Sequence, residues 1–229
     1  MKKVNFILSA LFLLIVVSTY GQVTKVTHHS FDHYNDKVET FRKERRVDST
    51  DIVMLGNSLT EYAGNWSKLL GIKDVINRGI AGDDVDGIYN RLNQILSGHP
   101  KAIFLMIGID DLTQNLNPEN VAEGTEKLIM RIRRESPKTK LYVQSILPIN
   151  ESFGVWKIQG DKAAEISAVN NLLRKYSAHH KIEFINLYPN FVRHGTNVMR
   201  KELTLDGLHL SAFGYKIWAY ELRRYMKSL

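Results

Sequence analysis

The stretch DIVMLGNSLT, residues 51–60, decides the fold, because a short apolar run gives way at once to a small polar loop. Residues 52–55 are all apolar, which is typical of a parallel strand buried on both faces of a sheet. Ser58 follows two residues after Gly56. In a parallel sheet the loops after the strands converge on one crevice. The stretch therefore predicts a buried strand with Ser58 at the edge where chemistry is expected.

The same alternation continues along the chain. Further apolar runs predict strands at 75–76, 102–107, 141–143 and 182–185, and helical periodicity predicts helices at 83–97, 118–135, 160–179 and 211–227. Asn117 before Pro118 and Ser211 before Ala212 supply signals for helix starts. This pattern predicts the α/β class, with a three-layer αβα arrangement and a flavodoxin-like, five-stranded parallel sheet flanked by helices. A polar and aromatic helix is expected at about 30–47, outside the sheet.

Residues 1–22 have the features of a secretory signal peptide. Two lysines precede an apolar run at 6–17, which is too short to span a bilayer, and small residues at 18–21 offer a cleavage site. The alternative is an uncleaved N-terminal anchor. The chain has no cysteine, which excludes a lipid-modified cysteine and a disulfide framework. We expect an exported protein, periplasmic or extracellular, with no stable membrane insertion after cleavage and with 23–229 forming a single domain.

The charge of the chain argues against nucleic acid as a partner. The formal net charge is +7, and the two lysines of the signal peptide account for 2 of it, which leaves 7 − 2 = +5 for the rest. No basic block with interleaved aromatic residues occurs, as nucleic-acid binding would favour. We expect a small-molecule or glycan partner instead. The sequence specifies no oligomeric state.

The late pair Asp206 and His209 gives Ser58 its candidate role. The two lie three residues apart just before the last predicted helix, and no other of the eight histidines has an acid at that offset. A carboxylate so placed can fix the tautomer of an imidazole that takes the proton of a serine. The alternatives are ordinary: a serine near a glycine is often a turn or a helix cap, and such Asp–His pairs arise by chance.

Two glycine-containing loops could supply donors for an oxyanion. Residues 77–83 (NRGIAGD) follow the second predicted strand, and residues 108–111 (GIDD) follow the third. A glycine lets a backbone amide approach a substrate closely, and an oxyanion needs donors aimed at charge that develops in the transition state. The alternative for both loops is a strand-to-helix turn with caps.

In this order, the blocks at 56–60, 77–83, 108–111 and 206–210 resemble those of the SGNH hydrolases, the GDSL-like family of lipases and acylhydrolases. Within this family the blocks are more similar to two secreted branches, the proteins like platelet-activating-factor acetylhydrolase and the sugar O-acetylesterases. The resemblance covers nearly all of residues 50–225. The resemblance implies Ser58 as nucleophile, His209 as base and Asp206 as the orienting acid. It also implies an oxyanion hole formed by the amides of Ser58 and Gly82 with residue 110. It implies neither a metal nor an organic cofactor.

Two positions depart from the family pattern. Asn57 stands where the family usually has Asp, and Asp110 stands where the family has the Asn that donates to the oxyanion. An ionised Asp110 can only accept hydrogen bonds and would repel the developing negative charge. One resolution is an Asp110 kept protonated by burial and by neighbouring carboxylates such as Asp111. The other is a weakened enzyme, because one lost donor typically costs about 10²- to 10³-fold in turnover.

We therefore expect a serine esterase that removes short acyl groups, with acetyl on a carbohydrate implied by the resemblance. The loop at 147–160 carries Asn150 and Trp156 as candidate substrate contacts, although Trp156 could equally pack the next helix. The alternatives are a lysophospholipase or thioesterase of the same family, or a carbohydrate-binding relative weakened by Asp110. A flavodoxin-like nucleotide binder would need a glycine-rich phosphate loop, which the turn after the first strand lacks.

Two pairs of adjacent histidines, at 28–29 and 179–180, could suggest a metal site. Neighbouring side chains point apart on a helix or a strand, and no third ligand lies close by in the sequence. We interpret both pairs as solvated surface and predict no metal site.

Overall fold

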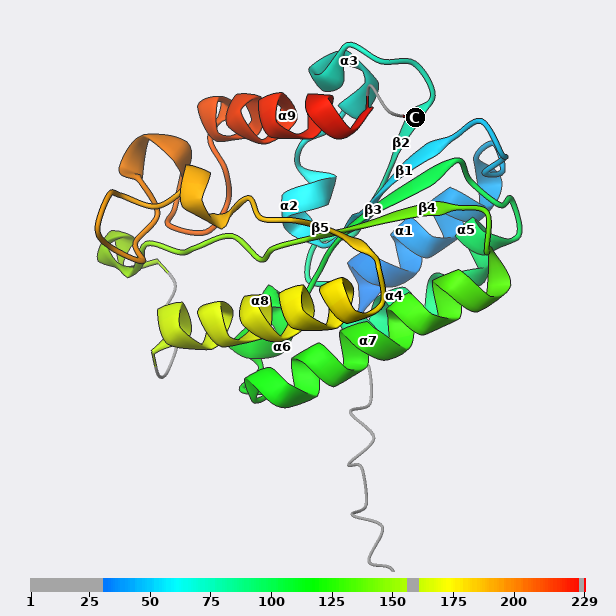
Figure 1. The fold of residues 1–229 in the computed structure, drawn as a ribbon. Helices are drawn as coiled ribbons and strands as arrows, with labels where there is room; N and C mark the ends of the chain where they lie inside the picture. The colour runs from blue at the N-terminus through cyan, green and yellow to red at the C-terminus, as the bar shows by residue number, and fades with distance from the viewer. Residues whose placement is uncertain (1–30, 156–160, 227–228) are drawn as a thin grey trace, which may run out of the picture.

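Five parallel strands form a single sheet in the computed structural model, which describes residues 31–155, 161–226 and 229. The strands are β1 (Ile52–Gly56), β2 (Val75–Gly79), β3 (Ala102–Met106), β4 (Lys140–Gln144) and β5 (Glu183–Ile185). Their order across the sheet is β2-β1-β3-β4-β5 (Figure 1). This is the flavodoxin-like order, in which ligands bind beyond the carboxyl ends of the strands. The predicted class and sheet are confirmed.

Long helices connect and cover the strands, and short ones lie in the loops after them. The α-helices are α1 (Asp32–Lys43), α2 (Ser58–Glu61), α3 (Trp66–Leu70), α4 (Val85–Arg91), α5 (Asn93–Leu96), α6 (Ile109–Thr113), α7 (Pro118–Glu135), α8 (Lys162–His179) and α9 (Ala212–Met226). Three 3-10 turns are η1 (Glu151–Phe153), η2 (Tyr188–Asn190) and η3 (Lys201–Leu203). Among the described residues, no helix is both long and apolar enough to span a membrane.

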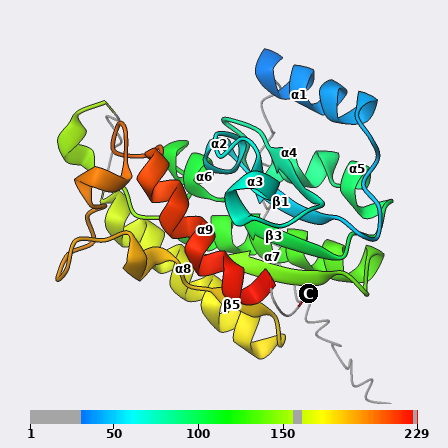
Figure 2. The ribbon, with the colours of Figure 1, turned by 90° about the horizontal axis from the view of Figure 1, so that it is seen from above.

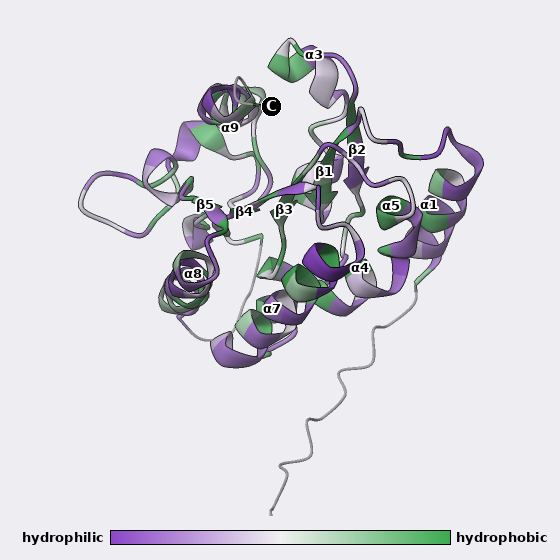
Figure 3. Cartoon of the chain, turned by 45° about the vertical axis from the view of Figure 1, so that its right-hand side comes forward, coloured by the Kyte–Doolittle hydropathy of each residue, from purple (hydrophilic) through white to green (hydrophobic). Residues whose placement is uncertain are grey.

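Successive side chains of the strands feed two separate cores, one on each face of the sheet. Val53 and Leu55 of β1 face a core built with α4, α5, α7 and α8. Ile52 and Met54 of the same strand face a core built with α2, α3 and α9. Alternate strand residues point to opposite faces, so a strand covered on both sides must be apolar throughout. Figure 3 shows hydrophobic colour on the strands and polar colour on the outer helix faces.

The helix expected at 83–97 is divided in the structure. Asp84 caps its start by accepting a hydrogen bond from the amide of Gly87 at 2.8 Å. The helical hydrogen bonding is then interrupted at Leu92, which separates α4 from α5. Leu92 keeps right-handed helical angles, φ −61° and ψ −28°, and is fully buried. The interruption is therefore a local change in hydrogen bonding and not a loop.

Helix α1 occupies Asp32–Lys43 within the range 30–47 where a helix is expected. It lies to one side of the sheet, beside the β2 edge, as the view from above shows (Figure 2). Tyr34 and Phe41 pack with Ile80, which follows β2, in a small core of their own. The Tyr34 hydroxyl donates to the carbonyl of Gly87 in α4 at 2.9 Å. These contacts hold α1 against the loop that carries Gly82.

Candidate active site

Ser58 is the first residue of α2, directly after the carboxyl end of β1. Asn57 caps this short helix by accepting a hydrogen bond from the amide of Leu59 at 3.2 Å. The cap fixes the turn between strand and helix and holds Ser58 at the N-terminal end of α2. The residue is largely buried but its hydroxyl reaches the imidazole of His209. The local sequence thus places one hydroxyl at the edge where the loops converge.

His209 joins Ser58 to Asp206 in a chain of hydrogen bonds. Its Nε2 lies 3.0 Å from Ser58 Oγ and its Nδ1 lies 2.7 Å from Asp206 Oδ2. The other oxygen of Asp206 accepts the amides of Leu208 at 2.9 Å and His209 at 2.7 Å. Burial alone would raise the pKa of Asp206, but these hydrogen bonds hold it below its ordinary value. An ionised carboxylate only accepts, so Nδ1 carries the proton and Nε2 faces the serine as a base.

The loop that carries this pair is fixed from beneath by Asn150. Gly207 has φ +95°, and a Cβ there would lie 2.3 Å from the carbonyl oxygen of Asn150, so this position requires glycine. The amide of Asn150 donates to the carbonyl of Gly207 at 2.7 Å, and its side chain donates to the carbonyl of Met199 at 2.7 Å. Asn150 is only 3% exposed. Its side-chain atoms are engaged with Met199 and Ser152, so Asn150 supports the catalytic loop, and a contact with substrate stays a prediction.

Gly82 lies in the loop after β2 with φ +80° and is exposed. A ring carbon of Phe31 lies 3.1 Å from the position that a Cβ would take there. The neighbouring amide of Ala81 donates to Glu61 Oε2 at 2.6 Å. In the described ranges, neither the amide of Ser58 nor that of Gly82 has an internal acceptor. Both are available to donate to a bound oxygen.

The two positions that depart from the family pattern are in contact with each other. Asn57 Nδ2 donates to Asp110 Oδ2 at 2.6 Å. Burial raises the pKa of Asp110 to about 7, although the hydrogen bond from Asn57 lowers it, and the charges of Asp83 and Asp84 raise it further. Asp83 and Asp84 thus oppose its ionisation, and Asp110 and Asp111 also oppose each other's, as the sequence suggested. A substantial share of Asp110 is protonated at neutral pH.

Three further acids lie beneath Asp110. Asp83 forms a buried ion pair with Arg91 at 2.8 Å. Asp111 accepts a hydrogen bond from the amide of Val85 at 3.2 Å. Burial, followed by the charge of Asp84, raises the pKa of Asp111 to about 8. These groups brace the loops of Gly82 and Asp110 against each other.

Sequence reasoning missed Glu61 and Tyr62, which both lie near the serine. The Tyr62 ring lies 5.1 Å from the His209 ring, centre to centre, and is 54% exposed. Residues one helical turn apart share a face, so the spacing of four from Ser58 could have indicated Tyr62. Glu61 stands three residues after Ser58, as in a capping box, but its carboxylate turns to His33 at 2.9 Å and to Ala81. No local pattern predicts that tertiary contact.

The structure describes only some of the remaining segments that the sequence singled out. Trp156, the signal peptide at 1–22 and the pair at 28–29 lie outside the described residues. The rings of His179 and His180 contact each other at 4.9 Å, and His180 also packs on Tyr176. No group of three or more metal-ligating side chains occurs in the part of the chain that the structure describes.

Known proteins share the sequence pattern and the fold of this chain. The platelet-activating factor acetylhydrolase IB subunit alpha1 of Pongo abelii is 24% identical over 171 residues, covering 72% of this chain and 70% of that protein. A Streptococcus pneumonia protein, provisionally described as a platelet activating factor, has a TM-score of 0.76 and 27% identity, covering 85% of this chain and 92% of its own. The acetyl xylan esterase AlAXEase has a TM-score of 0.65 and 19% identity, covering 76% and 98%.

A family model decides the assignment. The model of the GDSL-like lipase/acylhydrolase family matches residues 26–217, which include the loops of Ser58, Gly82, Asp110 and His209. The protein therefore belongs to the GDSL-like lipase/acylhydrolase family and is a carboxylic ester hydrolase.

Proposed function

We propose that the protein is a serine esterase that removes short acyl groups, acetyl in particular, from carbohydrate esters. The observation that carries the proposal is the chain of hydrogen bonds from Asp206 through His209 to Ser58. An acetyl xylan esterase shares the fold, and a relative is named as an acetylhydrolase. The apolar run and lysines of residues 1–22 further support the proposal that the enzyme acts after export.

The proposed reaction proceeds through an acyl-enzyme. His209 Nε2 takes the proton of Ser58, and the serine oxygen attacks the ester carbonyl. The negative oxygen of the tetrahedral intermediate is held by the amides of Ser58 and Gly82 and by Asp110. His209 then gives its proton to the leaving alcohol. Water, deprotonated by His209, attacks the acyl-enzyme and releases the carboxylic acid and Ser58.

Asp110 takes part in this scheme in its neutral form. Asn57 donates to one carboxyl oxygen, Oδ2, so the other oxygen, Oδ1, is the place for the proton. A neutral carboxyl is then a hydrogen-bond donor, which replaces the side-chain amide that the family has at this position. The same group, once ionised, opposes the reaction.

The test is hydrolysis of p-nitrophenyl acetate and release of acetate from acetylated xylo-oligosaccharides. Wild type should hydrolyse both, and Ser58→Ala should lose about 10⁴-fold or more, because the nucleophile is removed. An organophosphonate should label wild type at Ser58 and leave Ser58→Ala unlabelled. Activity in Ser58→Ala equal to wild type would contradict the proposal. Sugar binding without any Ser58-dependent hydrolysis would instead identify a non-catalytic carbohydrate-binding relative.

A further inference from the structure

A groove of about 700 Å³ lies between α3 and α9, outside the catalytic hydrogen bonds. The two helices lie side by side in Figures 1 and 2. The groove is lined mainly by Ala63, Lys68 and Leu69 on one side and by Lys216, Tyr220 and Arg223 on the other. Tyr220 is 68% exposed, so its ring is accessible at the side of the groove. The proposed mechanism uses none of these residues.

The groove is cationic. Three basic side chains line it, and no carboxylate does. Among the described residues, neither Lys68 nor Lys216 has a carboxylate within ion-pair distance. Arg223 donates to the carbonyl oxygens of Leu69 at 3.1 Å and Leu70 at 3.3 Å, which positions the guanidinium without neutralising it. A surface with one sign of charge around an apolar floor attracts a ligand of the opposite charge.

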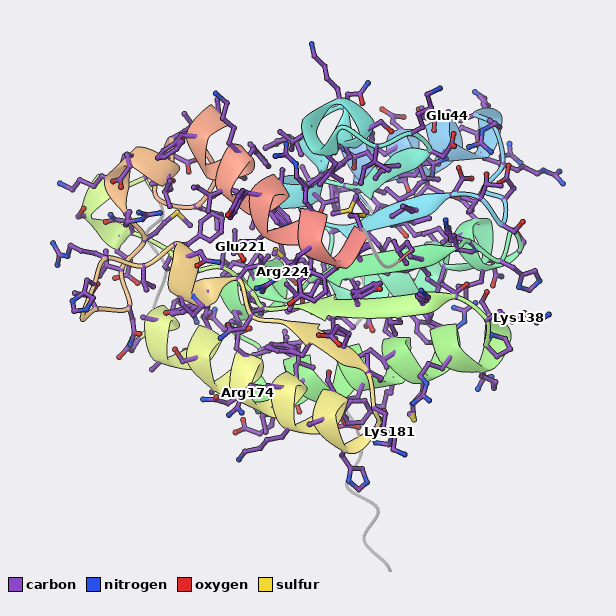
Figure 4. The ribbon with its side chains drawn as sticks, turned by 45° about the horizontal axis from the view of Figure 1, so that its top comes forward. Glu44, Lys138, Arg174, Lys181, Glu221 and Arg224 are labelled. Carbon is purple, nitrogen blue, oxygen red and sulfur yellow. The ribbon has the colours of Figure 1, made fainter. Side chains whose placement is uncertain are left out.

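The nearest acid on α9 is engaged elsewhere. Glu221 lies 3.6 Å from Arg224 in an ion pair and is not part of the groove lining. Figure 4 labels both residues, which lie close to each other on α9. The positive charge of Lys68, Lys216 and Arg223 is therefore left for a ligand.

One side of the groove is continuous in the chain with the helix of Ser58. Its lining residue Ala63 directly follows Tyr62, whose ring lies beside that of His209. His209 protonates the leaving alcohol in the proposed reaction, so the alcohol leaves on that side. The Tyr215 hydroxyl donates to the carbonyl of Leu59 at 2.8 Å and fixes α9 against the helix of Ser58. The groove and the serine thus belong to one rigid arrangement.

We propose that this groove is a subsite for an anionic oligosaccharide, the alcohol part of the ester that Ser58 cleaves. The inference rests on the proposed function and specifies its substrate class. Exposed aromatic rings of Tyr62 and Tyr220 provide flat apolar surfaces for sugar rings, and the cations pair with carboxylates along the sugar chain. Lys216 and Arg223 are seven residues apart on α9, a span of about 10 Å, which suits a short oligomer better than one acyl group.

The first experiment measures binding without catalysis. Full-length Ser58→Ala protein is titrated with non-acetylated oligogalacturonate by calorimetry at low salt. The additional changes Lys68→Gln and Lys216→Gln should weaken binding about tenfold or more, because two charge-assisted contacts are lost. A matched control carries Lys138→Gln and Lys181→Gln, which lie just before the amino ends of β4 and β5 (Figure 4) and should bind as the parent does.

The second experiment measures specificity in the active enzyme. Lys68→Gln with Lys216→Gln should lower kcat/KM about tenfold on acetylated oligogalacturonate, mainly through KM. The same variant should keep its rate on p-nitrophenyl acetate and on neutral acetylated xylo-oligosaccharides. Tyr220→Ala should weaken binding of both sugars, since an aromatic surface contributes to either.

Three results would contradict the proposal that the groove is a subsite for an anionic oligosaccharide. These are equal binding of oligogalacturonate by the groove variant and its parent, tighter binding of the neutral oligosaccharide, or groove-dependent binding only to vesicles of anionic phospholipid. Failure of the proposed function gives a different result. In that case p-nitrophenyl acetate is not hydrolysed in a Ser58-dependent way, while the calorimetric comparison still decides whether the groove binds an anionic sugar.

Discussion

Asp110 is the residue at which chemistry and sequence pattern conflict, and its protonation resolves the conflict. A neutral carboxyl can donate to the oxyanion, whereas an ionised one repels it. Because burial raises the pKa of Asp110 to about 7, the donor is present below neutral pH and is lost above it. In the proposed mechanism the same residue should therefore set an upper pH limit on turnover. The hydrogen bond from Asn57 orients the carboxyl in either state.

The substitution Asp110→Asn should remove that limit. Two pH units above its pKa only about one carboxyl in a hundred keeps its proton, so wild-type kcat should fall steeply between pH 6 and about 9. An amide donates at every pH, so kcat of the variant should stay level and exceed wild type by about 10-fold or more at pH 9. The measurement is kcat against pH with p-nitrophenyl acetate, with the Ser58→Ala rate subtracted.

The control is Asp110→Ala, which has no donor and should be slow across the whole range. An alkaline fall that persists unchanged in Asp110→Asn would assign the limit to another group. A variant with the same rate as wild type at every pH would show that residue 110 contributes nothing to the oxyanion.

At the scale of elements, α1 contacts the loop of Gly82 through its small apolar core and also through one carboxylate, Glu61 of α2. Glu61 is held by His33 at 2.9 Å and Lys37 at 3.3 Å from α1, and it accepts the amide of Ala81. Burial would raise the pKa of Glu61, but these partners hold it below its ordinary value, so the carboxylate is ionised at neutral pH. Ala81 precedes Gly82, so the position of the Gly82 amide depends on this contact.

Removal of that brace should affect turnover more than substrate binding. Glu61→Ala should lower kcat about tenfold with little change in KM, because a displaced donor weakens transition-state stabilisation alone. Glu61→Gln should recover part of the loss, since its amide oxygen can still accept the amide of Ala81. The matched control is Glu39→Ala, which removes an exposed ion pair with Arg42 on α1 and should leave kcat unchanged. Equal losses in Glu61→Ala and Glu61→Gln would show that charge, not the Ala81 contact, is what matters.

Elements with local causes were predictable from the sequence. The strands are apolar throughout because both faces are covered, and Asn117 caps α7 by accepting the amide of Asn120 at 2.8 Å. The pairing of Ser58 with His209 was implied by the family resemblance, and it agrees with the convergence of strand-end loops on one crevice. Other features had only tertiary causes. The turn of Glu61 toward α1, the burial of Asn150 under Gly207 and the groove beside Tyr62 depend on segments far apart in the sequence.

The molecule as a whole carries acids whose pKa values move in opposite directions. Asp110 and Asp111 have raised values, whereas Asp206 and Glu61 have lowered ones. When folding raises the pKa of a carboxyl, the folded state binds more protons than the unfolded state at every pH between the two pKa values. The free energy of unfolding then falls as pH rises across that interval. For Asp111 this pH interval runs from about 4 to about 8. Asp206 and Glu61, whose pKa values are lowered, change the free energy of unfolding only at more acidic pH.

Asp111→Asn should therefore stabilise the protein at alkaline pH and do little in acid. Below pH 4 the wild-type carboxyl is neutral in both states, and the isosteric amide can accept the amide of Val85 in its place. At pH 9 the wild type must fold with an ionised, buried Asp111, at a cost on the order of a few kcal/mol that the variant avoids. In thermal unfolding, the Tm of the variant should be close to that of wild type at pH 4 and several degrees higher at pH 9. Exposed Asp74→Asn, which changes the same charge at the surface, should show no such pH-dependent gain. A lower Tm for Asp111→Asn at pH 9 would mean that the ionised carboxylate stabilises the loops, and it would reverse the sign argued for this pair of acids.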